Sequence, residues 1–221
     1  MFGEIDQLIS NRESPYPENL LLAREKLEAL PGQAAGPVSI RLAEVLFWLG
    51  EYAEDSAEKE KYFSAGVEAG KKAVELEAEN VAAHLWYAAC MGSHGVVRGI
   101  MSSLFYLGPV EKHGKKAMEL DENYYEGGPL RLMGRLYQQA PGWPVGPGDG
   151  KKAIELLEKA VKVGPDVLYN HVYLAEAYLA KSRKGDASRM IEDVLSRVDG
   201  LKYQRQAAMI KKDALALKAR L

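Results

Sequence analysis

Four histidines and one cysteine are the side chains of this sequence that could serve as bases, metal ligands or nucleophiles. His84 and His171 precede similar apolar helical segments, so we expect a shared packing role in which each ring is satisfied locally. His94 and His113 have no cysteine or carboxylate beside them at metal-ligand spacing. Cys90 lies in an apolar segment with no adjacent base and is expected to be a buried thiol.

Phosphate-binding and acid–base motifs are also missing from the sequence. The stretch from Gly146 to Lys152 lacks the Gly-x4-Gly-Lys-Ser/Thr order of a phosphate-binding loop. The acidic run between Glu51 and Glu60 fits a solvated helix face rather than a catalytic carboxylate pair. We therefore predict a non-enzymatic protein with no catalytic site, no cofactor and no metal.

A stripe of polar side chains is the first candidate for binding. Arg131, Arg135 and Gln138 are spaced i, i+4 and i+7, which places them on one face of a helix. One interpretation is a carboxylate clamp, because a guanidinium binds a carboxylate in a bidentate way. The other is a solvated stripe paired with Glu126 or other acids.

Two apolar insertions are the other candidates. The first, 92–108, includes Met101, Phe105 and Tyr106. Its apolar density is too large to stay in water as one patch, so it either folds back as an extra helical turn or forms a ligand groove, an oligomer contact or a partner site. The second, 140–150, holds Trp143 between Gly142 and Pro144. Trp143 either plugs against neighbouring helices or serves as a recognition anchor.

The elements that position these residues are indicated by a repeated string, Gly-Lys-Lys-Ala-x-Glu-Leu, at 70–76, 114–120 and 150–156. The first two copies end a helix, whereas the third begins one, directly after a Gly/Pro-rich loop. The true counterpart of Ala73 and Ala117 is therefore Ala160, which gives spacings of 44 and 43 residues. A steady period of this length indicates stacked helical repeats, each presenting the same packing face to its neighbour.

The repeats resemble tetratricopeptide repeats (TPR). Segment 130–165 carries the large, small and aromatic residues of that pattern: Leu130, Met133, Gly134, Tyr137, Ala153, Leu157, Ala160 and Pro165. Segment 171–194 matches the pattern more loosely, with His171, Leu174, Ala175, Tyr178, Ala187, Ile191 and Val194. In such repeats the face that carries Arg131, Arg135 and Gln138 lines the concave surface. The resemblance implies an all-α fold of antiparallel helix pairs.

A narrower resemblance rests on segments 124–131, 134–137, 140–144 and 170–176. They are similar to the T-component (TatT-like) proteins associated with bacterial tripartite (TRAP) periplasmic transporters. That resemblance implies a periplasmic, lipid-anchored protein that assembles into oligomers and works beside a solute-binding protein. It also implies an apolar ligand channel or pocket lined by 92–108 and Trp143.

We accordingly predict one all-α domain, a TPR-like α-solenoid of antiparallel helix pairs with a C-terminal capping helix. A leading helix (17–30) and a linker (33–37) come first, within residues 1–37. TPR-like units follow at 38–80, 81–124, 125–167 and 168–200. The last helix, 201–221, covers the apolar face of the final unit. An alternative for that helix is a detachable arm used in oligomerisation.

Charge and hydropathy limit the classes of partner and the cellular location that the sequence allows. A net charge of −2 gives no basic field, which argues against nucleic acid as a partner. No stretch reaches the roughly 18 apolar residues of a membrane helix, and the first residues do not form a signal peptide. The chain as given fits the cytoplasm, or the periplasm if a signal segment has been removed, so the compartment stays open.

Two functions follow from these observations. The first is a scaffold that binds a protein or peptide partner, or forms a homo-oligomer, through its concave face or its insertions. The second is a transport accessory that binds or passes a small apolar ligand. The candidate binding residues are Arg131, Arg135, Gln138, Trp143, Met101, Phe105 and Tyr106.

Overall fold

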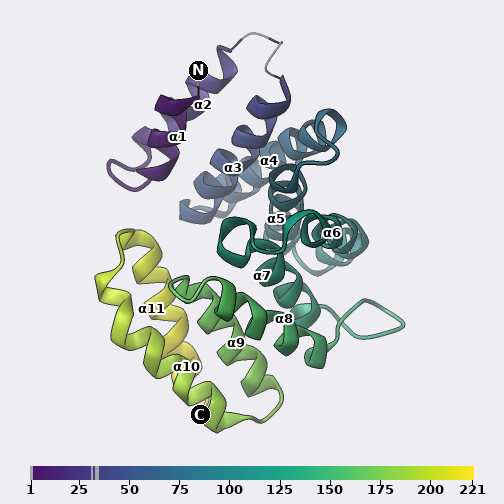
Figure 1. Cartoon of the computed structure of the whole chain (residues 1–221), viewed down its shortest axis with the longest axis vertical. Coiled ribbons are helices and arrows are strands. Elements are labelled where there is room, and N and C mark those ends of the chain that lie inside the picture. Colours follow the sequence, from purple (N-terminus) through teal and green to yellow (C-terminus); the bar gives the residue numbers. More distant parts are fainter. Residues whose placement is uncertain (1, 31, 33–34) are drawn as a thin grey trace. The chain divides into compact units, whose positions relative to one another are not determined.

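The computed structural model describes residues 2–30, 32 and 35–221, and this part of the chain is helical and contains no strand (Figure 1). It forms two compact units, Met1–Leu120 and Asp121–Leu221. The helices of the first unit, in chain order, are α1 (Gly3–Ser10), α2 (Glu18–Glu28), α3 (Ala35–Tyr52), α4 (Ser56–Leu76), α5 (Val81–Arg98) and α6 (Ile100–Asp121). The second unit contains α7 (Tyr124–Gln139), α8 (Gly150–Val163), α9 (Leu168–Ala180), α10 (Lys184–Arg197), the 3₁₀ turn η2 (Val198–Gly200) and α11 (Gln204–Lys218).

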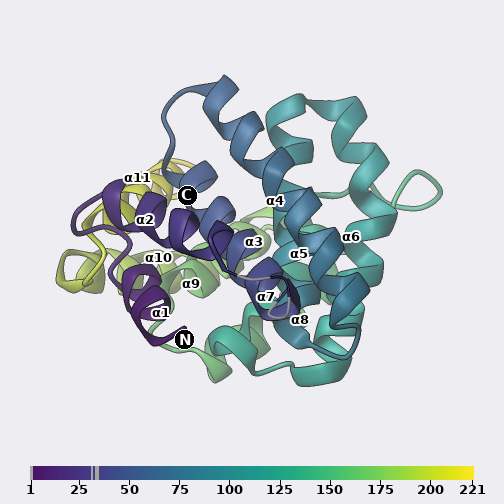
Figure 2. The same ribbon diagram turned by 90° about the horizontal axis from the view of Figure 1, so that it is seen from above.

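Within each unit the helices pack as adjacent pairs. In the first unit α3 contacts α4, α4 contacts α5, and α3 also contacts α5. In the second, α7, α8, α9 and α10 contact in sequence, and α7 also contacts α9. Figure 2 shows α4, α5 and α6 running side by side. Contacts between consecutive helices, with further contacts between α3 and α5 and between α7 and α9, are typical of a helical solenoid, so the predicted all-α, solenoid-like fold is confirmed.

The alanines of the predicted repeat register are buried, as is Ala153 of the third literal string. Ala73, Ala117 and Ala160 lie near the ends of α4, α6 and α8, and each is completely buried. The third literal Gly-Lys-Lys-Ala string instead begins α8 at Gly150. An alanine is therefore buried near the end of each of α4, α6 and α8, where a larger side chain would push neighbouring helices apart.

Short polar residues determine where three of these helices begin. The Asp55 carboxylate accepts hydrogen bonds from the backbone N–H groups of Ala57 and Glu58 at 2.9 and 3.0 Å, which starts α4. Asn80 and Asp149 cap α5 and α8 in the same way. The acidic run between Glu51 and Glu60 thus spans the end of α3 and the first turns of α4.

The start of the chain differs from the prediction. Sequence analysis identified one leading helix, whereas α1 precedes α2. This short helix buries Ile5 and Ile9 on one face, and Asp6 accepts two hydrogen bonds from Arg41 of α3, at 2.6 and 3.1 Å. An eight-residue helix depends on such tertiary contacts rather than on propensity. Of the predicted linker, residues 33–34 lie outside the described part, and α3 begins at Ala35, three residues before its predicted start at residue 38.

The last helix covers the final pair, as predicted. Helix α11 packs on α9 and α10, and Figure 1 shows the three side by side. Their shared core is entirely aliphatic: Leu168, Val172, Ala175, Ile191, Val194, Val198, Ala207, Ile210, Ala214 and Leu217. In this position α11 closes an apolar face that would otherwise meet water.

Candidate interaction surfaces

The most exposed large apolar side chains of the first unit lie where α5 turns into α6. We call Val96, Ile100, Met101 and Phe105 the α5–α6 tip. Their side chains are 67, 80, 81 and 76 % exposed. The interpretation that segment 92–108 folds back over the stack is therefore wrong. The segment instead prolongs both helices, and one side of the helical hairpin is exposed.

Local geometry fixes the α5–α6 tip. Gly99 joins the two helices with φ of +94°, a conformation that favours glycine. A Cβ on Gly95 would lie 3.0 Å from the Cα of Ser103, so the two helices approach closely there. Just behind the tip, the Tyr106 hydroxyl and Nδ1 of His94 form a hydrogen bond of 3.1 Å. Burial and the nearby Arg98 guanidinium lower the pKa of His94, because both disfavour the charged form of the ring.

Of the candidate residues at this turn, Met101 and Phe105 are thus exposed, whereas Tyr106 is partly buried. Tyr106 is half-buried and hydrogen-bonded to His94, so it positions α6 against α5. Val96 and Ile100 belong to the exposed surface but were not among the candidate residues. They could have been found from the same apolar run in the sequence.

Trp143 is the most exposed large apolar residue of the second unit, at 90 %. The interpretation that it plugs against neighbouring helices is wrong. It lies in the connection between α7 and α8, which extends away from these two helices as a wide loop (Figures 1 and 2). The Pro-rich composition of the loop makes folding back costly, because each proline fixes its φ and lacks an N–H for pairing.

The arginine stripe is held by side chains of α9. Nη1 of Arg131 donates to Oδ1 of Asn170 at 3.0 Å. Arg135 pairs with Glu176, and its guanidinium lies 4.4 Å above the Tyr173 ring. Gln138 accepts a further bond from Arg135 at 2.9 Å. A carboxylate clamp stays a prediction, and it would require an incoming carboxylate to displace Glu176.

Sequence analysis did not single out Asn170, although this residue joins three segments of the second unit. Asn170 is completely buried. Its amide nitrogen donates to the carbonyl oxygens of Ala160 and Gly164, each at 2.9 Å, and lies 3.5 Å from that of Glu126. Its oxygen accepts the bond from Arg131. An asparagine next to a proline-containing turn was the available signal.

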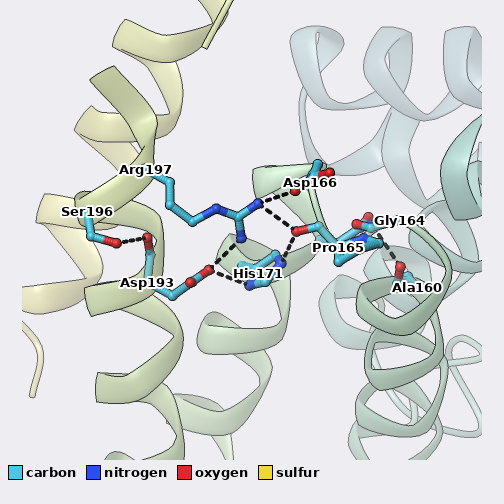
Figure 3. A network of polar contacts seen from close by, with 9 residues as sticks. Ala160, Gly164, Pro165, Asp166, His171, Asp193, Ser196 and Arg197 are labelled. Atoms are coloured by element: carbon cyan, nitrogen blue, oxygen red, sulfur yellow. Dashed lines mark hydrogen bonds and ion pairs between the residues drawn. The ribbon is translucent and has the colours of Figure 1, made fainter. Parts of the chain in front are cut away.

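The two equivalent histidines share a local role, as predicted. His84 Nε2 donates to the carbonyl of Ala78, and His171 Nε2 donates to that of Pro165, both at 2.9 Å and both six residues back. Each ring thereby ties the first turn of its helix to the turn before it. Figure 3 shows the second case.

In the second case the histidine belongs to a larger polar network. Nδ1 of His171 lies 3.0 Å from Asp193, which also pairs with Arg197 of the same helix, α10. Arg197 donates to the Pro165 carbonyl and to Asp166, at 3.0 and 2.7 Å (Figure 3). These bonds connect α10 to the α8–α9 turn.

His113 of α6 stacks on His84, with ring centroids 5.0 Å apart and the two Nδ1 atoms 2.8 Å apart. Because Nε2 of His84 carries the proton donated to Ala78, its Nδ1 is the acceptor and His113 is the donor. Burial, the neighbouring His84 and Lys112 lower the pKa of His113 to about 4. Its ordinary value is about 6.5.

This histidine pair predicts a loss of stability in acid. The unfolded chain binds more protons than the folded chain between pH about 6.5 and 4, so the free energy of unfolding falls as the pH is lowered through that window. Because His113 is half exposed, we expect a loss of only about 1 kcal/mol between pH 7.5 and 5. Urea denaturation at both pH values, compared with His113→Gln, measures it. An equal pH dependence in the variant would contradict the assignment.

Cys90 is completely buried, as expected, and lies 3.5 Å from the Ala43 carbonyl. Burial raises the pKa of its thiol. Among the described residues, no group of three or more His, Cys, Asp or Glu side chains is arranged to hold a metal ion. No helix in the described part of the chain combines the length and apolar character needed to span a membrane.

These features define a class: an all-α protein of packed helix pairs with exposed apolar surfaces at two of its turns. The family of regulator of microtubule dynamics proteins 1–3 (RMD1-3) matches residues 1–136, and the chain belongs to this family. Regulator of microtubule dynamics protein 1 from Bos taurus is 34 % identical over an alignment of 100 residues, and the match covers 42 % of this chain and 31 % of the bovine protein. The match thus spans about a third of that relative.

These comparisons correct the family predicted from the sequence. The resemblance to TatT-like T-components of TRAP transporters was wrong, because the matched family and the matched relative are both regulators of microtubule dynamics. The solute-binding partner, the ligand-passing role and the bacterial assignment lose their support with it, as does the narrower TPR label. The residues that suggested it include small residues at helix crossings and apolar core positions, such as Gly134, Leu130 and Leu174, which any stacked helix pair requires.

Proposed function

We propose that this chain is a non-enzymatic interaction scaffold whose α5–α6 tip contacts a protein partner. The observation that carries the proposal is the exposure of Ile100, Met101 and Phe105, each at 76 % or more. Fully burying a side chain of this size is worth about 1.5–3 kcal/mol. A patch of several such residues on a rigid hairpin therefore offers substantial binding energy.

The composition of the α5–α6 tip fits a protein contact. Methionine and aromatic side chains are enriched at the centres of protein interfaces, which have polar rims. Arg98 and Glu60 form such a rim, with an ion pair of 3.4 Å next to the tip. The close crossing at Gly95 and the bond between Tyr106 and His94 hold the tip in one shape, so little conformational entropy is lost on binding.

Family membership suggests which partner to test. The α5–α6 tip lies within residues 1–136, the part that matches the RMD1-3 family. The bovine relative is named for the regulation of microtubule dynamics. We therefore propose microtubules as the partner of this chain.

Glutamate substitutions in the α5–α6 tip should remove this binding. We expect Met101→Glu and Phe105→Glu each to weaken microtubule cosedimentation at least about tenfold, because a charge would be buried in an apolar contact. Leu76→Glu is the matched control, since Leu76 is a half-exposed apolar residue of α4 in the same unit. Absence of cosedimentation for the natural chain, or equal binding by all variants, would overturn the proposal.

A homo-oligomer is the other partner predicted from the sequence. Light scattering of the same variants separates it from a microtubule contact. If the natural chain is oligomeric and Phe105→Glu is monomeric without any change in cosedimentation, the α5–α6 tip is a self-association surface and the proposed contact is wrong.

A further inference from the structure

The loop between α7 and α8 has a defined shape. We call residues 140–149 the Trp143 loop. The N–H groups of Gly148 and Asp149 donate to the carbonyls of Pro141 and Tyr137, both at 2.9 Å, and close its base. At Gly148 an added Cβ would collide with the backbone of Ala140 and Pro141, so only glycine allows this closure. The loop thus holds Trp143 outward rather than leaving it free to collapse.

Apolar exposure in the Trp143 loop is concentrated at its far end. Trp143 is 90 % exposed and Val145 is 65 % exposed. Tryptophan carries a large apolar ring and one N–H donor, which suits a boundary between apolar and wet surroundings. A protruding ring of this kind has to enter another phase or another molecule to become buried.

Lysines surround the base of the Trp143 loop. Lys151 is the second residue of α8 and its side chain is 88 % exposed, with Glu155 at 4.0 Å as its only ion-pair contact within the described residues. Lys152 is exposed and lies 4.6 Å above the Tyr137 ring. The side chain of Lys181 reaches Gly150 from the end of α9. The nearby Asp149 carboxylate is engaged by the N–H groups of Lys151 and Lys152.

We propose that the Trp143 loop is a membrane-surface anchor, in which Trp143 and Val145 enter the headgroup region of an anionic bilayer while Lys151, Lys152 and Lys181 contact its anionic lipids. Charge complementarity and shape favour a bilayer over a protein. The headgroup region accepts a protruding tryptophan without a preformed pocket, whereas a protein must supply one. Basic side chains near an anionic leaflet add attraction. Stable attachment to a membrane surface usually requires two membrane-binding features, and here an apolar anchor and a basic cluster provide them.

This surface is separate from the α5–α6 tip. It belongs to the second unit and lies beyond residue 136, where the family match ends. The inference therefore does not rest on the proposed microtubule contact. Failure of either leaves the other standing.

Tryptophan fluorescence tests the anchor directly. The chain contains three tryptophans, and Trp48 and Trp86 are buried, so a change on adding lipid reports Trp143. We expect a blue shift, and quenching by lipids brominated along the acyl chain, with vesicles of phosphatidylcholine and phosphatidylserine at 7:3, at about 0.1 M salt. Pure phosphatidylcholine vesicles should bind at least about tenfold more weakly. Salt at about 0.5 M should weaken binding to the anionic vesicles.

Variants separate the two signals. Trp143→Ala should lower partitioning in vesicle sedimentation at least about tenfold. Lys151→Gln and Lys181→Gln should each lower it about fivefold. Lys162→Gln is the matched control, because Lys162 is exposed in the same helix but far from the loop, and it should bind as the natural chain does. All four changes are at exposed positions, so circular dichroism should be unchanged.

Three results would overturn the proposal. One is the absence of partitioning into anionic vesicles at low salt. Another is partitioning that Trp143→Ala leaves unaltered. The third is a concentration-dependent blue shift of Trp143 without lipid, which would show that the loop contacts a second protein molecule instead.

Discussion

Replacing Asn170 with alanine is expected to lower the free energy of unfolding by about 3 kcal/mol, measured by urea denaturation. The amide of Asn170 bonds the carbonyls of Ala160 and Gly164 and accepts from Arg131 in a completely buried position. Alanine would remove three hydrogen bonds from a site away from water, although the carbonyls of Ala160 and Gly164 keep their backbone bonds from Gly164 and Val167. A hydrogen bond contributes about 0.5–1.5 kcal/mol, and one from a charged group such as Arg131 about 1.5–3 kcal/mol. The effect should be largest in the second unit, as hydrogen exchange over 121–221 would show.

A second asparagine provides the control for this prediction. Asn19 also donates to two carbonyls, those of Asn11 and Ser14, at 2.9 Å. It is only half-buried, so water can replace its bonds. We expect Asn19→Ala to cost about 1 kcal/mol. If Asn170→Ala costs no more than Asn19→Ala, Asn170 does not join the segments of the second unit as proposed.

The repeated Gly-Lys-Lys-Ala string allows an equally sharp comparison. We expect Gly70→Ala to destabilise the first unit by about 2–3 kcal/mol, because its Cβ would lie 2.7 Å from the backbone Cα of Tyr87. Gly150 holds the same place in the displaced third copy, but its Cβ would meet only the flexible end of the Lys181 side chain. Gly150→Ala should therefore change stability by less than about 1 kcal/mol.

Thermal and urea denaturation of the two variants would decide whether Ala160 or Ala153 is the counterpart of Ala73. Unequal costs support the register in which Ala160, rather than Ala153, corresponds to Ala73. Equal large costs at Gly70 and Gly150 would contradict it, and would restore three equivalent copies of the string.

Packing periodicity explains why so much of the architecture could be predicted from the sequence. Burial of Ala73, Ala117 and Ala160 follows from their spacing, because stacked helix pairs require a small residue at the same crossing. Helix α1 could not be predicted in the same way. Its eight residues are too few for a periodic signal, and its stability depends on contacts such as Asp6 with Arg41, which join distant segments.

The candidate surfaces show the limits of hydrophobic patterning. Apolar density in 92–108 indicated that the segment was important, but patterning alone could not decide whether Met101 and Phe105 faced a core or the outside. That depends on whether another element covers the hairpin, which is a property of the whole unit. Patterning likewise could not decide whether Trp143 was buried or exposed. The closure of its loop through Gly148 holds the side chain outward.

The family could not be deduced from the same residues. Small and apolar positions of that resemblance, such as Leu130 and Gly134, serve helix packing, so they recur in unrelated helix-pair proteins, whereas Trp143 is exposed. The arginine stripe illustrates a related difficulty. Its spacing was evident, but Glu176 and Asn170, which hold it, lie about 40 residues further along the chain.

Photo-crosslinking at the α5–α6 tip is the most direct measurement of the proposed contact. A photoreactive phenylalanine analogue at Phe105 should form covalent adducts with tubulin when the chain is irradiated on microtubules, and mass spectrometry would identify them. The same analogue at Leu76, exposed in the same unit, should form few. Adducts from position 105 but not 76 are the predicted result. Cosedimentation without adducts at position 105, or equal yields at both positions, would contradict the α5–α6 tip as the site of contact.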